Sequence, residues 1–214
     1  HGGYINIALG WCLGLTLGVF ISAKVSGAHL NPAVTIAMAM VKKLPWCKVP
    51  HYIIGQIFGA FVAAATVFFV YHAQWLSIDP SLSHTTGILA TFPSIKTSLL
   101  PGLFDQILGT MLLVIFIMAL TDQNNTMPQG NMFPLFIGLG LLAIATSFGG
   151  LHGFAINPAR DFAPRLFALM AGFKNTGFER GIWLIPVVAP IIGGCIGAKI
   201  YEHTIGKYLK KSQN

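Results

Sequence analysis

The chain has 214 residues, and only 9% of them are charged. Soluble domains carry about 25%. Its three cysteines, Cys12, Cys47 and Cys195, show no CxxC spacing and lie in or beside apolar stretches, which argues against a disulfide framework or a zinc site. No Ser/His/Asp arrangement, metal-ligand spacing or phosphate-binding loop is present. The sequence therefore predicts no enzyme: no catalytic residue, no metal and no cofactor.

Apolar residues dominate instead. They make up 54% of the chain, and the mean hydropathy is +0.70. This composition predicts an integral membrane protein. The net charge of +7 does not indicate a nucleic-acid partner, because the basic residues stand at the ends of apolar segments.

Five apolar runs are long enough to cross about 30 Å of hydrocarbon. They cover residues 5–23, 52–71, 103–121, 133–148 and 182–198. Residues 73–102 are too polar to cross and are expected to form a long outer connection. Within the first run, Gly10, Gly14 and Gly18 recur every four residues. We interpret this spacing as a face for close helix packing rather than a pore lining.

The tripeptide Asn-Pro-Ala occurs twice, as Asn31-Pro32-Ala33 and Asn157-Pro158-Ala159. Asn is a preferred N-cap and Pro suits the first helical position, so one copy alone would indicate only a capped helix. Each copy begins a helical stretch too short to span, about residues 31–40 and 158–171. Such segments are tolerated in a membrane where they line a cavity or are surrounded by protein. The two copies therefore predict two re-entrant half-helices.

The two copies also define an internal repeat within a single channel domain, residues 1–214. The first repeat, 1–72, contains a span, a half-helix and a span, whereas the second, 103–205, has two spans before its half-helix. We therefore expect one helix to be missing at the front, so that five of six transmembrane helices are present. Three spans per repeat require the halves to insert with opposite orientation. The N-termini of the half-helices should then meet near the midplane.

This geometry predicts a mechanism. Two helix N-termini that face one point create a positive potential there, which opposes cations and protons but not neutral solutes. The asparagine amides can donate hydrogen bonds into the lumen. Extended backbone before each asparagine would offer a ladder of carbonyl acceptors, formed by Gly27, Ala28, His29 and Leu30 in one loop and by Gly153, Phe154 and Ala155 in the other.

Basic residues indicate the orientation. A cytoplasmic side is predicted where they cluster, which includes the C-terminus: Lys24, Lys42, Lys43, Lys48, Lys207, Lys210 and Lys211. Four basic residues fall on the outer side, so at least one should act inside the protein: Arg160, Arg165, Lys174 and Arg180.

Together, these features resemble the major intrinsic protein (aquaporin) family over essentially the whole chain. The two Asn-Pro-Ala motifs carry the resemblance, with Ser26-Gly27-Ala28-His29 before the first and Arg160 after the second. Within the family, the sequence resembles the aquaglyceroporin branch, the glycerol facilitators, at Asp161, Arg165 and the pair Pro186-Val187. The resemblance implies an all-α polytopic fold, a homotetramer with one pore per subunit, glycerol and water as permeants, and a plasma-membrane location.

Motif alignment with that family implies an outer selectivity filter of Trp11, Ala145, Phe154 and Arg160. Strict water channels usually have Phe, His, Cys and Arg there, so Ala145 implies a wider opening. Trp11 and Phe154 are expected to form an apolar corner opposite Arg160. Gln106 stands where the family has an acidic residue and should accept hydrogen bonds from loop amides, with Asp105 at an interface and Asp161 in support.

The sequence favours a passive channel for glycerol, small uncharged solutes and water, and it leaves two alternative functions open. One is a strict water channel, and the other is a non-conducting structural membrane protein of the same fold. Two histidines are also left open. His29 either holds its loop as a neutral imidazole or acts as a pH-sensitive group, and His152 is expected towards the outer vestibule without an assigned role.

Overall fold

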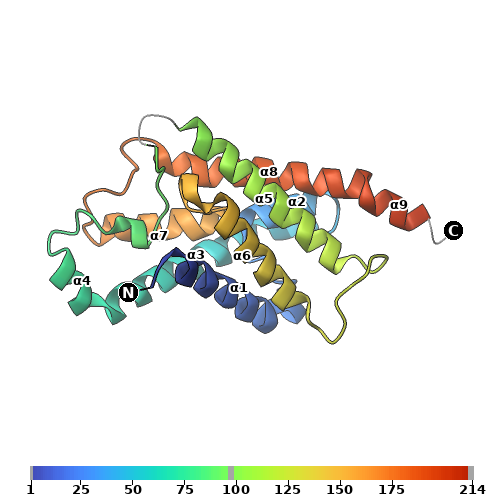
Figure 1. Cartoon of the computed structure of the whole chain (residues 1–214), viewed down its shortest axis with the longest axis horizontal. Coiled ribbons are helices and arrows are strands. Elements are labelled where there is room, and N and C mark those ends of the chain that lie inside the picture. Colours follow the sequence, from blue (N-terminus) through green and yellow to red (C-terminus); the bar gives the residue numbers. More distant parts are fainter. Residues whose placement is uncertain (1, 96–98, 212–214) are drawn as a thin grey trace.

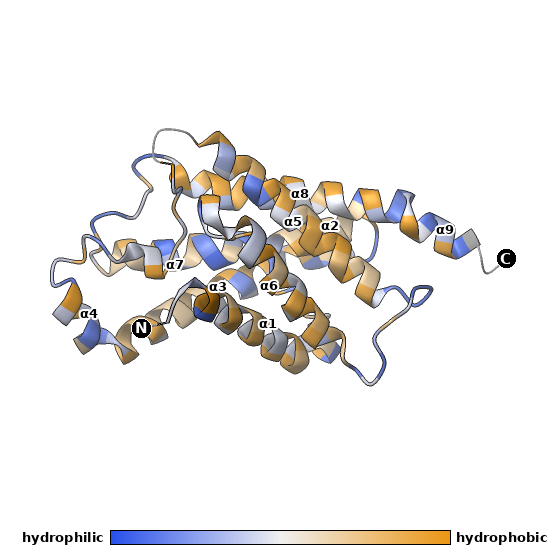
Figure 2. Ribbon diagram, in the orientation of Figure 1, coloured by the Kyte–Doolittle hydropathy of each residue, from blue (hydrophilic) through white to orange (hydrophobic). Residues whose placement is uncertain are grey.

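The computed structural model describes residues 2–95 and 99–211, and its elements are helices (Figure 1). Residues 96–98 of the expected outer connection lie outside the described residues, as do His1 and residues 212–214. Five helical segments are long and apolar enough to cross a membrane, as predicted. They contain α1 (Tyr4–Ser26), α3 (Val49–Val70), α5 (Leu100–Thr121), α6 (Phe133–His152) and α8 (Ile185–His203). Hydrophobic residues cover most of their length, and hydrophilic residues gather in the loops and at the ends (Figure 2).

Two short helices begin at the asparagines. They are α2 (Pro32–Met40) and α7 (Pro158–Met170). Asn31 and Asn157 are N-caps in extended conformation, and each side chain accepts a hydrogen bond from the backbone N–H two residues on. Proline follows at the first helical position, where a backbone N–H would have no helical partner. The two half-helices lie on opposite sides of the middle of the molecule (Figure 1).

The polar connection between α3 and α5 is partly helical, which the sequence did not predict. Its α4 (His72–Ile78) packs the Trp75 ring against Phe68 and Phe173, with ring centroids 5.3 and 5.6 Å away. This aromatic cluster fixes a helix of seven residues, which is too short to cross a membrane. The other short elements are η1 (Trp46–Lys48), η2 (Thr86–Ile88), η3 (Ile182–Leu184) and α9 (Ile205–Lys211).

Glycine spacing has two different consequences in this fold. On α8, a Cβ added at Gly193 or Gly197 would collide with backbone carbonyls of α5, so these glycines allow α5 and α8 to approach closely. On α1, a Cβ at Gly10 or Gly14 would meet no described atom within 4 Å. A Cβ at Gly18 would lie 3.1 Å from the Leu30 side chain, which belongs to a loop. Among the described residues, Cβ atoms at these three positions would therefore meet no neighbouring helix, contrary to the interpretation of the spacing as a helix-packing face.

Helices α1 and α3 are much less buried than α8. Within their most apolar windows, 22% of α1 and 11% of the η1–α3 segment is buried, against 44% of the segment that contains α8. A Cβ added at Gly55 or Gly59 on α3 would meet no neighbouring described atom within 4 Å, because both glycines line a cavity. The expected additional helix before residue 1 stays a prediction.

Candidate solute pore

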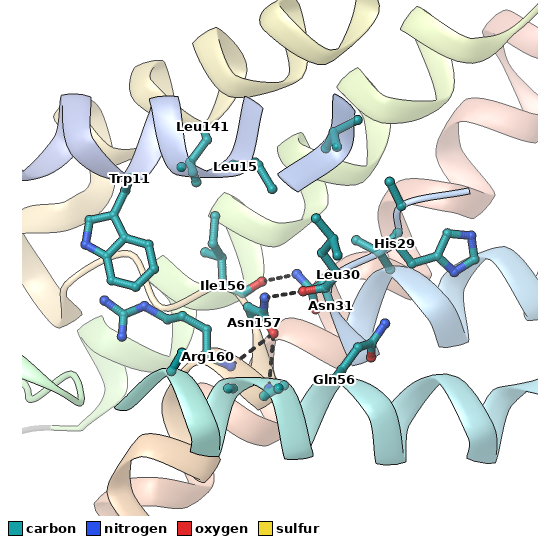
Figure 3. Close-up of a pocket in the computed structure, with 18 of the residues that line it drawn as sticks. Trp11, Leu15, His29, Leu30, Asn31, Gln56, Leu141, Ile156, Asn157 and Arg160 are labelled. Atoms are coloured by element: carbon teal, nitrogen blue, oxygen red, sulfur yellow. Dashed lines mark hydrogen bonds between the residues drawn. The ribbon is translucent and has the colours of Figure 1, made fainter. Parts of the chain in front are cut away.

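The two asparagines cross-link the loops at the centre of the molecule. Asn31 Nδ2 donates to the Ile156 carbonyl over 2.8 Å, and Asn157 Nδ2 donates to the Leu30 carbonyl over 2.9 Å (Figure 3). Each Oδ1 accepts backbone N–H groups of its own half-helix. An amide nitrogen carries two hydrogens, so each asparagine keeps one donor beyond this crossed pair. The N-termini of the half-helices therefore meet, as the inverted repeat predicts.

A cavity of about 940 Å³ passes this crossing point. Asn31, Asn157 and the carbonyls of Leu30 and Ile156 lie on one side of it, and side chains such as Leu15 and Leu141 lie on the other (Figure 3). The lining includes Gly27, Ala28, His29 and Leu30 of the first loop and Phe154 and Ala155 of the second, but not Gly153. One wall offers hydrogen bonds and the opposite wall is apolar, which suits a solute with hydroxyls along a carbon edge.

The loop backbone is not simply extended, contrary to the prediction. In the first loop, φ is +72° at Gly27, +50° at Ala28 and +52° at Leu30. The second loop repeats this pattern at Gly153 (+71°), Phe154 (+35°) and Ile156 (+39°). A left-handed residue with a side chain costs roughly 1–2 kcal/mol. Such strain persists only where the surroundings hold it, so the loops need supporting contacts.

Gln106 supplies one such contact for the second loop. It is fully buried, and its Oε1 accepts the Ile156 N–H over 2.7 Å. Its Nε2 makes longer contacts, 3.3 Å to Asp105 Oδ2 and 3.5 Å to the His152 carbonyl. The predicted acceptor role of Gln106 agrees with this geometry. Asp105, expected at an interface, is instead buried beside Gln106 and is 3% exposed.

Arg160 lies at one end of the cavity. Its guanidinium carbon lies 4.0 Å from the centroid of the Trp11 ring, within cation–π distance, and its Nη1 donates to the Leu89 carbonyl over 3.3 Å. Trp11 thus contacts Arg160 directly, whereas the sequence placed the arginine opposite the aromatic corner. Phe154 also lines the cavity and packs edge-on against Tyr4.

Ala145 does not line this cavity. It is fully buried, and its carbonyl accepts a hydrogen bond from the Tyr4 hydroxyl over 2.9 Å. Its role as a filter residue therefore stays a prediction. His152 is also fully buried rather than in a vestibule, and neither ring nitrogen has a hydrogen-bond partner among the described residues.

The other end of the cavity is organised around Thr35. Its hydroxyl donates to the Asn31 carbonyl and lies within hydrogen-bond distance of Gln56 Nε2 and of His29 Nδ1. Because the hydroxyl has one hydrogen, which goes to Asn31, it must accept from the other two. Neutral His29 therefore carries its proton on Nδ1. This arrangement favours the interpretation of His29 as a loop-holding imidazole.

A carboxylate holds a turn in the connection between α3 and α5, and the Leu82 carbonyl of this turn accepts a hydrogen bond from the Lys174 N–H, just beyond the end of α7. Asp79 accepts hydrogen bonds from the backbone N–H groups of Ser83, His84 and Thr85 and from the Thr85 hydroxyl. Burial raises the pKa of Asp79, but these hydrogen bonds outweigh it and hold that pKa well below its ordinary value. The carboxylate therefore remains charged, and the loop keeps this turn near neutral pH.

Sequence reasoning missed the Leu89 carbonyl as a hydrogen-bond partner of Arg160. A backbone acceptor in an irregular loop has no sequence pattern of its own. Tyr52 was also missed, because a tyrosine in an apolar run is ordinarily a lipid-facing or core residue. Its ring packs against His29 at a tilt of 45°, and its hydroxyl donates to the Ser26 carbonyl.

Comparison with known proteins agrees with this geometry. The sequence profile of the family described as "Major intrinsic protein" matches residues 1–201. "Aquaglyceroporin-2" of Rhizophagus irregularis is 43% identical over 210 residues, which cover 94% of this chain and 66% of that protein. The chain thus spans just under two thirds of that relative. The "Glycerol uptake facilitator protein" of Pseudomonas aeruginosa is 37% identical over 97% of this chain and 79% of its own length.

A solved structure also matches nearly all of the chain. The X-ray structure of the aquaglyceroporin from Plasmodium falciparum superimposes with a TM-score of 0.89 at 32% identity, and the match covers 98% of this chain and 86% of that one. The predicted fold class and the predicted resemblance to aquaglyceroporins are thereby confirmed. The chain belongs to the major intrinsic protein family.

Proposed function

We propose that the protein is a passive transmembrane channel that conducts glycerol, other small uncharged solutes and water and excludes ions and protons. The observation that carries this proposal is the crossed pair of Asn31 and Asn157 at the middle of the cavity. Both helix N-termini point there, and both amides keep a donor. The relatives named as an aquaglyceroporin and a glycerol facilitator support the same function and argue against an enzyme.

Exclusion of charge follows from the same centre. Each half-helix N-terminus carries roughly half a positive charge. A cation at the crossing point would meet both ends, whereas a hydroxyl would meet two amide donors and the neighbouring carbonyls. Arg160 adds a full positive charge at the outer end, beside Trp11. A neutral polyol meets no such barrier.

The selectivity filter is proposed to consist of Trp11, Phe154 and Arg160, with Ala145 giving width behind them. A solute would place its carbon edge on the aromatic rings and its hydroxyls towards Arg160 and the carbonyl side of the cavity. Bulkier residues at these positions would let water pass but not glycerol. The alternative function, a strict water channel, therefore predicts a lower ratio of glycerol to water permeability.

Reconstitution into proteoliposomes tests the proposal. Stopped-flow light scattering after a glycerol gradient and after a sucrose gradient gives the glycerol and water permeabilities separately, and a pH-sensitive dye inside the vesicles reports proton leak. We expect both permeabilities to exceed those of empty vesicles, with no added proton leak. Water flux without glycerol flux would support the strict water channel, and the absence of both would support a structural protein.

Assembly and orientation are further parts of the proposal. The protein is a multi-pass membrane protein, and we propose that it forms a homotetramer in the plasma membrane with a cytoplasmic C-terminus. Lys207 and Lys210 near that end support the orientation under the positive-inside rule. Chemical cross-linking in membranes and protease access to a C-terminal tag would test the two points.

A further inference from the structure

Among the described residues, one carbonyl of the loop between η2 and α5 accepts a hydrogen bond from the Arg160 guanidinium. Besides the Trp11 ring, its side chain contacts the carbonyl of Leu89, in the loop between η2 and α5. The Leu89 and Ala90 N–H groups both bond to the Thr86 carbonyl. The position of the Leu89 carbonyl therefore depends on how the chain is held on either side of it.

Thr91 holds the chain two residues further on. Its N–H and its hydroxyl both donate to Asp161 Oδ2, over 2.7 and 2.8 Å, and its carbonyl accepts from Arg165 Nη2 over 2.7 Å. All three of its polar groups are thus bound by one pair of residues on α7. Its side chain also packs against Gly153 of the second pore loop, where an added Cβ would lie 3.1 Å from the Thr91 methyl group.

The pair that binds Thr91 is fully buried. Asp161 and Arg165, one turn apart on α7, are both 0% exposed, and Asp161 Oδ1 accepts from Arg165 Nε and Nη2 over 2.9 and 2.8 Å. Arg165 Nη1 donates to the Thr176 carbonyl. Two N–H groups of Arg165 thus converge on one carboxylate oxygen in charge-assisted hydrogen bonds, and leaving either charge alone in the interior would be strongly unfavourable. The pair is therefore a rigid anchor.

None of Thr91, Asp161 and Arg165 is among the described residues that line the cavity. Asp161 directly follows Arg160, so one turn of α7 carries both the arginine at the constriction and the anchor of the loop that holds it. We propose that Thr91 is a specificity-determining positioning residue: fixed by the Asp161–Arg165 pair, it places the Leu89 carbonyl and thereby the Arg160 guanidinium. This inference rests on the proposed channel function.

The expected effect concerns selectivity rather than the amount of flux. Without a well-placed carbonyl, Arg160 keeps its contact with Trp11 but moves more widely across the opening. A polyol needs more of that opening than water does. Loss of the Thr91 hydroxyl should therefore lower the glycerol-to-water permeability ratio by roughly threefold, the effect of losing one hydrogen bond in a buried network.

Three variants test the proposal in proteoliposomes. Thr91→Val removes the hydroxyl but keeps the backbone N–H on Asp161, and Thr91→Ser keeps the hydroxyl. Thr86→Val is the matched control, because the Thr86 hydroxyl is buried in the same loop with no hydrogen-bond partner among the described residues. We expect a lowered ratio in Thr91→Val alone. An unchanged ratio in that variant, equal loss of both permeabilities, or the same change in Thr91→Ser would overturn the proposal.

A second measurement does not depend on conduction. Hydrogen–deuterium exchange of the segment 86–92 in purified protein should be several-fold faster in Thr91→Val than in wild type or Thr86→Val. If wild type conducts nothing yet this exchange difference is found, the channel proposal fails while the anchor stands. If wild type conducts glycerol but exchange and ratio are unaffected by Thr91→Val, the anchor fails and the channel proposal stands.

Discussion

Replacing Gln106 by leucine should loosen the second pore loop. Gln106 Oε1 is the acceptor for the Ile156 N–H, both residues are buried, and Ile156 holds a left-handed φ of +39°. Leucine has a similar size but no acceptor. The buried N–H would then have no partner, which costs about 1–3 kcal/mol. The strained conformation of Ile156 would also lose one of the contacts that hold it.

The functional consequence follows from the hydrogen bond that the Ile156 carbonyl accepts. The Ile156 carbonyl accepts the Asn31 amide over 2.8 Å, so movement of Ile156 displaces half of the crossed asparagine pair. We expect Gln106→Leu to lower glycerol permeability several-fold. At roughly 2–4 °C per kcal/mol for a protein of this size, the temperature of thermal denaturation in detergent should fall by roughly 2–12 °C.

Two further variants separate hydrogen bonding from packing. Gln129→Leu, at an exposed loop position, is the control and should change neither quantity. Gln106→Glu keeps the acceptor for Ile156 but places a carboxylate beside Asp105 Oδ2, where Nε2 now lies 3.3 Å away. Two adjacent carboxylates repel unless one binds a proton, so this variant should be less stable than wild type. A Gln106→Leu protein with wild-type denaturation temperature and flux would refute the supporting role.

Four other substitutions have defined outcomes. Arg160→Ala removes the charge at the outer end and should increase proton or ion leak in vesicles while the protein stays folded; unchanged leak and selectivity would count against its role as a barrier. Ala145→His places a larger side chain at a fully buried site and should cut glycerol flux more than water flux, and an equal loss of both would contradict the assignment. His29→Ala should lower glycerol flux at every pH from 5 to 8 without changing the shape of the profile, because a second proton on His29 would leave its Nδ1 bond in place; a changed shape would favour the pH-sensitive interpretation. Gly193→Ala would force a Cβ into the backbone of α5 and should destabilise the protein by about 1–3 kcal/mol in a denaturation assay, whereas Gly150→Ala, in open space on α6, should not.

The helices could be predicted from the sequence because a membrane allows few alternatives. Backbone groups in hydrocarbon must be bonded within a helix or a closed barrel, so an apolar run of about 20 residues has one simple interpretation. The half-helices were equally predictable from the sequence, because Asn31-Pro32 and Asn157-Pro158 specify both the cap and the first helical residue. The meeting of their N-termini followed from the odd number of spans in each repeat.

The glycine pattern of α1 shows where such reasoning stops. Small residues every four positions allow another helix to approach, and they equally leave space for a solute. Gly10 and Gly14 face the cavity, whereas Gly193 and Gly197 face the backbone of α5, and both pairs have the same spacing. Only the position of the neighbouring helix distinguishes the two cases, and that is a property of the tertiary structure.

The irregular segments were the least predictable, because their contacts are made by the main chain. Alternating left-handed residues such as Phe154 and Ile156 run against their intrinsic preference and are held by partners far away in sequence. Leu89 acts through its carbonyl, for which any residue type would serve. Asp161 was predicted as a supporting residue from family resemblance, but its partner Thr91, 70 residues earlier, is visible only in the fold.

The two repeats are similar at the crossing point and different in what holds them. Both loops carry left-handed residues before the asparagine, and each offers one carbonyl to the opposite amide. In the second repeat, Gln106 on a neighbouring spanning helix binds a loop amide. In the first loop, the Ala28 N–H donates to the Ser26 hydroxyl, and the Ser26 carbonyl accepts from Tyr52. The first loop is therefore fixed largely by its own helix and by α3, and through the Asn31–Ile156 bond it depends on the support that Gln106 gives to the second. A substitution at Gln106 should consequently displace both pore loops, although Gln106 belongs to only one repeat.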